Sequence, residues 1–233
     1  MKKILPLLSL LFIFNHAFAA LPFFEPFADQ TGSGGTLYSV GSGLANQINA
    51  GNFWQLINSA AGNPQPTIVT GNLYSATLPP STGNSVLIVP ASAEGGRLNL
   101  NATVTSGRTY YSFLIKITNL DMVSASPANN WFSGFGDGVG AQSSPLLRVG
   151  ARVFTKRSGD GYVFGTGKTT DTGTYLYDAT VHDIDETVFV VAAYEQLAGV
   201  ATNSLLWINP DPNSFGTASA PAPTITVSTV GTP

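Results

Sequence analysis

Cysteine is absent from this chain of 233 residues, and charged residues make up only 10% of it. Without thiols, the chain has no thiol catalysis and no zinc site built on cysteine ligands. Its basic residues form no long run, and nucleic-acid binding is therefore not expected, because phosphate contacts require clustered lysine and arginine. Serine, threonine, asparagine and glycine supply the polarity instead, which suits an extracellular β-protein that meets hydroxyl-rich ligands.

A long apolar run is also absent after the N-terminus, where residues 1–19 read MKKILPLLSLLFIFNHAFA. The positive start at Lys2 and Lys3, the apolar stretch and the small residues that follow it predict a secretory signal peptide cleaved after Ala19. The apolar stretch is shorter than the about 20 residues that a membrane span needs. We therefore expect an exported protein without a membrane span after cleavage.

The sequence after the signal peptide predicts one domain over residues 20–228 and a short tail over residues 229–233. Helix patterns are nearly missing: residues 44–56 have room for a turn or two, but Gly51 interrupts them. Clusters of glycine, proline and asparagine recur and divide the chain into short apolar runs, which is typical of a sandwich or barrel. The predicted strands cover residues 67–70, 85–89, 97–101, 109–117, 147–154, 162–165, 174–177, 187–194, 205–208 and 224–227.

The pattern of apolar residues within these runs predicts how they pack. The run over residues 109–117 has one aromatic and aliphatic face, whereas the run over residues 187–194 is apolar on both faces and is expected at the centre of a sheet. Trp207 lies in a run that is also apolar on both sides and stops at Asn209 and Pro210, so we expect it to be buried where a strand ends at the rim. Two sheets with apolar faces must pack together, and the predicted fold is an all-β, antiparallel two-sheet sandwich of the jelly-roll type.

A set of sequence blocks in a fixed order resembles a known family. The blocks are FFEPFADQTGSGGTL, PTIVTGNL, GNSVLIVPASAEGGRLNL, TYYSFLIKITNL, FSGFGDG, VGARVFTKRSGDGYVFGTGK, ETVFVVAAYE and LLWINPDPNSFG. Together they resemble exported bacterial proteins, common in Verrucomicrobia and Planctomycetes, that carry a laminin-G-like, concanavalin A-like sandwich. The resemblance spans roughly residues 23–223 and implies a protein that is secreted, periplasmic or held at the bacterial cell surface.

The resemblance does not choose an activity. Relatives in the wider superfamily bind glycans, serve as adhesion modules or hydrolyse polysaccharides, and a shared fold does not decide among these functions. Chains of this type usually continue past the segment that matches residues 224–227 into a further strand. The resemblance therefore raises the alternative that this sandwich lacks its closing C-terminal strand.

The strongest catalytic candidates are Asp183 and Asp185, because retaining glycosidases use two carboxyl groups about 5–5.5 Å apart. They precede an apolar run, where a solvated turn is expected, and the Glu-x-Asp-x-Glu type pattern of concanavalin A-like glucanases is missing. His182 is the one histidine after the signal peptide, and without a second histidine or a cysteine we expect it at the surface rather than on a metal. The sequence thus predicts a protein without catalytic activity, with a polysaccharide hydrolase as the alternative.

No cofactor is expected, although calcium is an alternative. Laminin-G-like modules often bind one Ca²⁺ near the rim of the sandwich, and Asp137, Asp160 and Asp171 have suitable carboxylates. Calcium takes 6–8 oxygen ligands from several segments. Because Asp-Gly is also a common hairpin turn, Asp137 and Asp160 are explained without an ion.

The aromatic residues supply the ligand-binding candidates. Trp131 follows a loop and is predicted to stack on a sugar ring, with the amide of Asn130 and the carboxylate of Asp137 on the hydroxyl groups. The alternative is that Trp131 closes the end of the core, since large aromatic side chains are mostly buried. We therefore predict a module that binds a polysaccharide or cell-surface glycan through rim loops, with a purely structural or adhesive role as the alternative.

Overall fold

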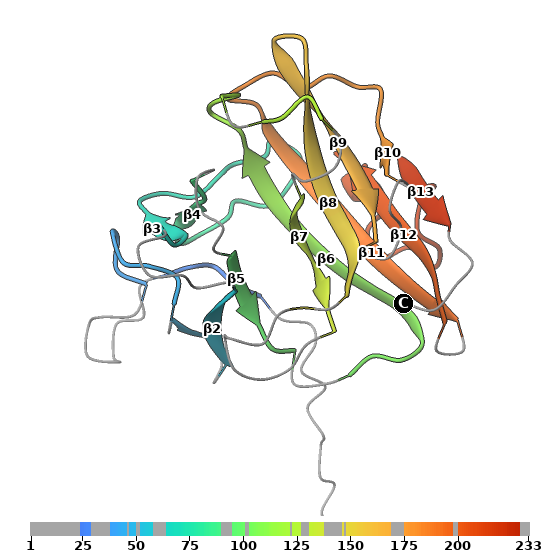
Figure 1. Ribbon diagram of the computed structural model, residues 1–233, viewed down its shortest axis with the longest axis horizontal. Coiled ribbons are helices and arrows are strands. Elements are labelled where there is room, and N and C mark those ends of the chain that lie inside the picture. The colour runs from blue at the N-terminus through green and yellow to red at the C-terminus, as the bar shows by residue number, and fades with distance from the viewer. Residues whose placement is uncertain are drawn as a thin grey trace, which may run out of the picture.

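The computed structural model describes the following residues: 24–28, 38–45, 47–49, 52–57, 64–89, 95–100, 103–121, 123–126, 131–137, 146, 148–168, 175–197 and 200–228. The predicted signal peptide, the predicted tail, Asn130 and Asp171 lie outside them. Within the described part, the chain consists of 13 strands and a single 3₁₀ turn, η1 (Pro212–Ser214) (Figure 1). No helix in this part has the length and apolar character that crossing a membrane would require.

Two four-stranded antiparallel sheets form the body of the molecule. Sheet I has the order β10–β9–β8–β7 and is built from β7 (Trp131–Gly136), β8 (Val149–Ser158), β9 (Gly161–Gly167) and β10 (Leu176–Tyr177). Sheet II has the order β13–β12–β11–β6 and is built from β6 (Gly107–Lys116), β11 (Thr187–Leu197), β12 (Val200–Ile208) and β13 (Ile225–Ser228). The predicted central position of the run at residues 187–194 is confirmed, because β11 pairs on both sides.

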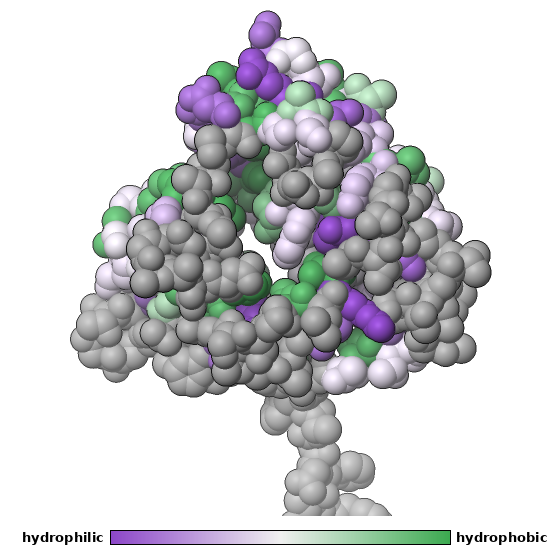
Figure 2. All heavy atoms as spheres, viewed as in Figure 1, coloured by the Kyte–Doolittle hydropathy of each residue, from purple (hydrophilic) through white to green (hydrophobic). Residues whose placement is uncertain are grey.

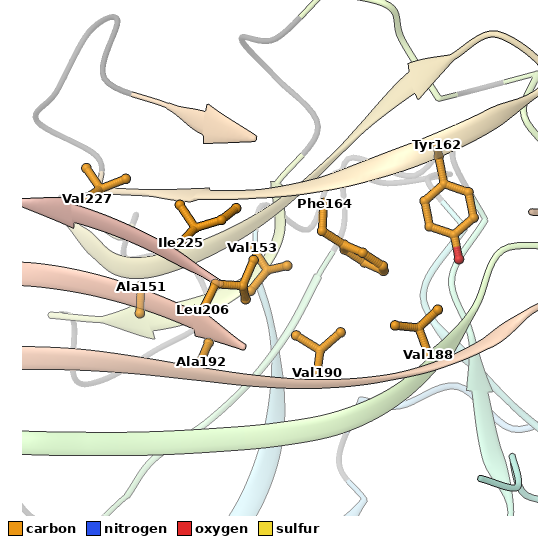
Figure 3. Packing of buried hydrophobic residues seen from close by; sticks show 10 residues of the cluster. All are labelled: Ala151, Val153, Tyr162, Phe164, Val188, Val190, Ala192, Leu206, Ile225 and Val227. Atoms are coloured by element: carbon orange, nitrogen blue, oxygen red, sulfur yellow. The ribbon is translucent and has the colours of Figure 1, made fainter. Parts of the chain in front are cut away.

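The main core lies between sheets I and II. Tyr162 and Phe164 of β9 point from one sheet toward Val188 and Val190 of β11 in the other, and all four are fully buried (Figure 3). β6 adds the face predicted from its alternation, which packs against this cluster through Tyr111, Phe113 and Ile115. The predicted all-β, antiparallel sandwich is therefore confirmed, and its interior holds the bulky residues of one face of each sheet.

A backbone irregularity in β8 forms hydrogen bonds with side chains of the other sheet. Ala151 has φ 46°, a left-handed conformation that is unfavourable for a residue with a Cβ atom. Two side chains of sheet II hold it: the Tyr111 hydroxyl donates to the Ala151 carbonyl at 2.6 Å, and the Ser204 hydroxyl accepts from the Ala151 N–H at 3.3 Å. Burial raises the pKa of Tyr111 well above its usual range, so this hydroxyl remains a donor. The irregularity fixes the backbone immediately before Arg152.

Two smaller sheets near the N-terminus lie beside the sandwich in Figure 1. One contains β1 (Ile48–Asn49), β2 (Asn52–Ile57) and β5 (Gly95–Leu98), and the other contains β3 (Thr67–Val69) and β4 (Ser85–Leu87). Their own core is built around Tyr38, Leu44 and Ile68. Residues 52–57 lie at the end of the stretch that has room for a helical turn or two, and they form β2 instead, because their interstrand hydrogen bonds to β5 override a weak local preference.

The Glu25 carboxylate joins three parts of this small core. It accepts a hydrogen bond from the Tyr38 hydroxyl at 2.6 Å and another from the Trp54 indole N–H at 2.9 Å. Its other oxygen accepts from the Phe27 backbone N–H at 2.8 Å. Because its carboxylate accepts these three hydrogen bonds, Glu25 has a structural role that explains its position without a ligand.

The described residues on the face shown in Figure 2 include both hydrophobic and hydrophilic ones. Large apolar side chains are exposed singly, including Tyr110 at 46% and Trp131 at 38%. Scattered exposure of this kind is normal in soluble proteins, and single residues carry no functional meaning without organised neighbours. The organisation of those neighbours distinguishes the two outer faces of the sandwich.

Candidate functional site

The strand register places one row of residues across the outer face of sheet I, which points away from the main core. Tyr177 of β10 lies opposite Gly165 of β9, and Gly165 lies opposite Phe154 of β8. Phe154 in turn lies opposite Trp131, the first residue of β7. With neighbouring strands about 4.8 Å apart, the row from Trp131 to Tyr177 is about 14 Å long.

This row belongs to a larger surface that we call the aromatic face. It consists of Trp131, Arg152, Phe154, Lys156, Tyr175 and Tyr177. Arg152, Phe154 and Lys156 alternate along β8 and therefore project to the same side of the sheet. Tyr175 and Tyr177 are spaced in the same way at β10.

Phe154 forms the base of the aromatic face. Its ring is fully buried, and the centroids of the Tyr175 and Tyr177 rings lie 4.8 Å and 6.5 Å from its own. Gly165 allows this packing, because a Cβ atom there would lie 2.6 Å from Cδ1 of Tyr177 and 2.7 Å from the Leu176 carbonyl oxygen. The absence of a side chain at Gly165 thus lets a tyrosine ring lie across β9.

Two cations accompany these rings. The Arg152 guanidinium carbon lies 4.9 Å from the Phe154 ring centroid and 5.4 Å from that of Tyr175. Arg152 is only 5% exposed. Its Nη2 donates to the Lys168 carbonyl, whereas its Nε has no hydrogen-bond partner in the part of the chain that the structure describes. The Lys156 ammonium nitrogen lies 4.6 Å from the Tyr177 ring centroid. Cation–π attraction explains why the cations stay on this face.

Neither cation is neutralised by a carboxylate within the part of the chain that the structure describes. The ion pairs found there join Arg108 to Glu195 and His182 to Glu186. The aromatic face therefore combines flat apolar rings with positive charge that the described residues leave uncompensated.

The hydroxyl of Tyr177 is neutral at physiological pH. Burial raises the pKa of Tyr177 to about 12, with a smaller effect of Tyr175 in the same direction, while the nearby Arg152 charge opposes the shift. The Tyr177 side chain therefore keeps a neutral hydroxyl, which can both donate and accept hydrogen bonds.

The predicted binding residues are not all brought together. Trp131 lies on the outer face of sheet I, so the alternative that it closes the end of the core is wrong. Asp137 follows the opposite end of β7, about 20 Å along the strand direction, and its Oδ1 accepts from the Arg148 N–H at 3.0 Å. Asn130 lies outside the described residues. Trp131 and Asp137 therefore cannot contact the same sugar ring.

Sequence reasoning missed most of the aromatic face. Its local signals are the alternation of Arg152, Phe154 and Lys156 and the spacing of Tyr175 and Tyr177. These signals show which residues share a side of one strand. Which strand neighbours which is decided by the register, and β7 was not predicted as a strand.

The prediction that His182 lies at the surface is wrong, since its exposed fraction is 4%. The segment before β11 folds back onto β9, where His182 and Tyr162 exchange both backbone hydrogen bonds. The His182 ring lies 5.7 Å from the Tyr162 ring and 5.4 Å from the Phe164 ring, and its Nδ1 lies 3.0 Å from the Glu186 carboxylate. This histidine is therefore part of the core edge.

The predicted solvated turn at the acidic cluster is confirmed. Asp183 and Asp185 are exposed, and Asp185 has φ 64°. The Glu186 carboxylate accepts from the Asp183 backbone N–H at 3.2 Å, which stabilises the turn. Asp-rich turns of this kind satisfy their own backbone and need no catalytic explanation.

The calcium candidates have different surroundings. Asp160 lies in the hairpin turn between β8 and β9, where Gly159 has φ 62° and Ser158 pairs with Gly161, so the predicted turn is confirmed. Across the described segments, no group of three or more histidine, cysteine, aspartate or glutamate residues is placed to hold a metal ion. Calcium binding at Asp137 or Asp160 stays an untested alternative to the expectation of no cofactor.

The outer face of sheet II carries similar residue types in a hydrogen-bonded row that we call the polar ladder: Arg108, Glu195, Asn203 and Ser228. Arg108 Nε donates to the Glu195 carboxylate at 3.1 Å, and the Ser228 hydroxyl donates to the Asn203 amide oxygen at 2.7 Å. The amide of Asn203 also donates to Glu195. This hydrogen bond, followed by those of Arg108, holds the pKa of Glu195 below its ordinary value.

A segment of the chain covers the part of this face around Trp207 and Phe189. Residues 209–224 connect β12 to β13, and the Trp207 indole N–H donates to the Pro221 carbonyl within that segment at 2.9 Å. The ring of Phe215 packs edge-on against Phe189 at 5.9 Å. The predicted burial of Trp207 is confirmed at 4% exposure, and so is the strand end at Ile208, but Trp207 lies in a small cluster outside the main core.

Comparisons with protein-family models, with curated proteins and with solved structures find no match for this chain.

Proposed function

We propose that this chain is an exported, non-catalytic β-sandwich module that binds a glycan on the aromatic face of sheet I. One observation carries the proposal: Trp131, 38% exposed, shares a strand-register row with Tyr177 on the outer face of sheet I. Sugar rings present apolar C–H groups on one side, and these pack against exposed aromatic faces. The ligand would thus lie along the sheet surface and not in the rim loops.

The aromatic face also supplies hydrogen-bonding groups beside its rings. The hydroxyl of Tyr177 and the ammonium of Lys156 lie next to the row that Trp131 begins. Glycan sites combine ring faces with a few polar groups that select hydroxyl positions. The resemblance to laminin-G-like, concanavalin A-like modules agrees with this role, as does the predicted secretory signal peptide.

Binding of the exported protein to an array of polysaccharides tests the proposal. We expect Trp131→Ala to abolish binding, because the exposed ring is lost, while Trp131→Phe retains part of it. Tyr110→Ala is the matched control, since Tyr110 is an exposed aromatic residue on sheet II, at 46%. Unchanged binding by Trp131→Ala, or an equal loss with Tyr110→Ala, would contradict the proposed site.

Further assays distinguish glycan binding from the two alternatives that the sequence suggests, a polysaccharide hydrolase and an adhesion protein. Release of reducing sugar that disappears in Asp185→Asn would establish a polysaccharide hydrolase, against the exposed turn in which Asp185 lies. Absence of both glycan binding and hydrolysis, in a protein that is folded by circular dichroism, would leave adhesion to a protein surface.

A further inference from the structure

The aromatic face carries positive charge in a chain whose formal net charge is −3 at pH 7. Lys156 makes one cation–π contact among the described residues, with the Tyr177 ring. No carboxylate of the described residues lies within 4.0 Å of its ammonium nitrogen. An ammonium group has three N–H donors, and a ring face satisfies them poorly. The donors of Lys156 are therefore available to a ligand on this face.

Arg152 adds a second, independent observation. Arg152 is 95% buried on the same face, yet among the described residues its Nε has no hydrogen-bond partner, and the hydrogen bond that its side chain makes there goes to a neutral carbonyl. Buried arginine is normally matched by a carboxylate or phosphate, because an unpaired charge away from water is unfavourable. On sheet II the comparable cation, Arg108, has such a partner in Glu195.

We infer that the glycan bound by the aromatic face is acidic, bearing carboxylate or sulfate groups that pair with Lys156 while a sugar ring stacks on Trp131. This inference rests on the proposed function and specifies its ligand class. Arg152 lies too deep to be the main contact and acts as a positioning residue, whose charge favours an anion above the Phe154 and Tyr175 rings.

Matched pairs of polymers that differ only in charge test the inference. Polygalacturonate is compared with its methyl ester for carboxylate, and dextran sulfate with dextran for sulfate. We expect the charged member of one pair to bind at least about tenfold more tightly, the range of a charge-assisted hydrogen bond. The difference should shrink as sodium chloride is raised, since the contact is at the surface.

Substitutions then assign the charge preference to this face. Lys156→Gln should reduce binding of the charged polymer about tenfold and flatten its salt dependence. It should weaken binding of neutral polymers much less, because the glutamine amide still forms hydrogen bonds with hydroxyl groups. Lys156→Arg should restore most of the affinity. Lys116→Gln, which removes an exposed lysine from sheet II, is the control for loss of net positive charge and should bind as the unaltered protein does.

The failures of the two proposals are distinguishable. Equal binding of charged and neutral members, lost in Trp131→Ala, would overturn the acidic ligand and keep the glycan site. A charge preference that Lys156→Gln and Lys116→Gln weaken equally would overturn the assignment to this face. Absence of binding to every polysaccharide, charged or neutral, would overturn both proposals.

Discussion

The two outer faces of the sandwich each carry a tryptophan and a cation, but the exposure of the tryptophan and the pairing of the cation differ between them. Sheet II has Trp207 at 4% exposure and an arginine, Arg108, that is paired with Glu195. Sheet I has Trp131 at 38% exposure and a lysine, Lys156, that contacts a tyrosine ring and no described carboxylate. The two faces carry similar residue types. They differ in whether the chain covers the tryptophan and whether a described carboxylate pairs with the cation.

On sheet II, the chain itself provides the cover. Residues 209–224 cross the face and supply the Pro221 carbonyl that accepts from the indole of Trp207. The comparison therefore teaches that aromatic and cationic side chains on a sheet face become part of the stable fold when other parts of the chain satisfy them. On sheet II, the connecting segment satisfies Trp207 and Glu195 of β11 satisfies Arg108. Where the described chain does not satisfy such side chains, the same chemistry is available to a ligand.

The largest expected effect is the difference in unfolding free energy between alanine substitutions of the two tryptophans. Trp207→Ala should lower the free energy of unfolding by about 3–5 kcal/mol, because it removes a buried ring and leaves a cavity. Trp131→Ala should lower it by about 1 kcal/mol or less, since its ring is already partly in water. Urea denaturation of both variants measures the difference.

Equal destabilisation by the two substitutions would break the comparison, because Trp131 would then be as structural as Trp207. Replacement by phenylalanine provides the matched pair. Trp207→Phe should recover part of the lost stability and Trp131→Phe should hardly change it, since only the buried site depends on ring volume.

A smaller effect is expected at the glycine that underlies the aromatic face. Gly165→Ala places a Cβ atom 2.6 Å from the Tyr177 ring and 2.7 Å from the Leu176 carbonyl, so β10 must shift. We expect a loss of about 1–3 kcal/mol from overpacking, together with weaker glycan binding. Gly95→Ala is the control, because the nearest atom to its Cβ is 3.8 Å away and no strain follows.

If Gly165→Ala binds glycan as the unaltered protein does, the position of Tyr177 does not matter to the ligand. Thermal unfolding and array binding, measured on the same preparations, distinguish this result from a protein that has simply unfolded.

The fold was largely predictable, because strand periodicity is a local property. Alternation along residues 109–117 and the two apolar faces of residues 187–194 predicted β6 and β11 together with their packing. β7 escaped prediction because WFSGFG contains two glycines, and its pairing with β8 has two register shifts that disturb alternation. Irregular strands leave a weak sequence pattern.

The candidate site was predictable only in part, because it depends on pairing between strands that are distant in sequence. The sequence singled out Trp131, but the register alone places it opposite Phe154, and Asp137 at the far end of the same strand. The burial of His182 has the same origin, since it follows from a bridge to Tyr162. The local pattern shows on which side of its strand a residue lies, whereas the register decides which residues of the neighbouring strand it meets.

The smallest expected effect concerns the polar ladder and its pH dependence. The pKa of Glu195 lies below its ordinary value of 4.5 in the folded state, mainly through Asn203 and then through Arg108. A carboxylate of this kind stabilises the fold fully above the unfolded pKa, and the stabilisation is lost as the pH falls through the folded pKa. The Arg108 and Glu195 side chains are 34% and 19% exposed, so solvent screening limits the contribution to about 1 kcal/mol or less.

Glu195→Gln should therefore be less stable than the unaltered protein at about pH 7 and nearly equal to it at about pH 3, measured by urea denaturation. Lys156→Gln on the other face should show no such convergence, because no described carboxylate pairs with Lys156. A pH-independent gap for Glu195→Gln would mean that its hydrogen bonds, and not its charge, hold the ladder together. Convergence in both variants would instead reveal a carboxylate on the aromatic face, and the charge difference between the two sheets would disappear.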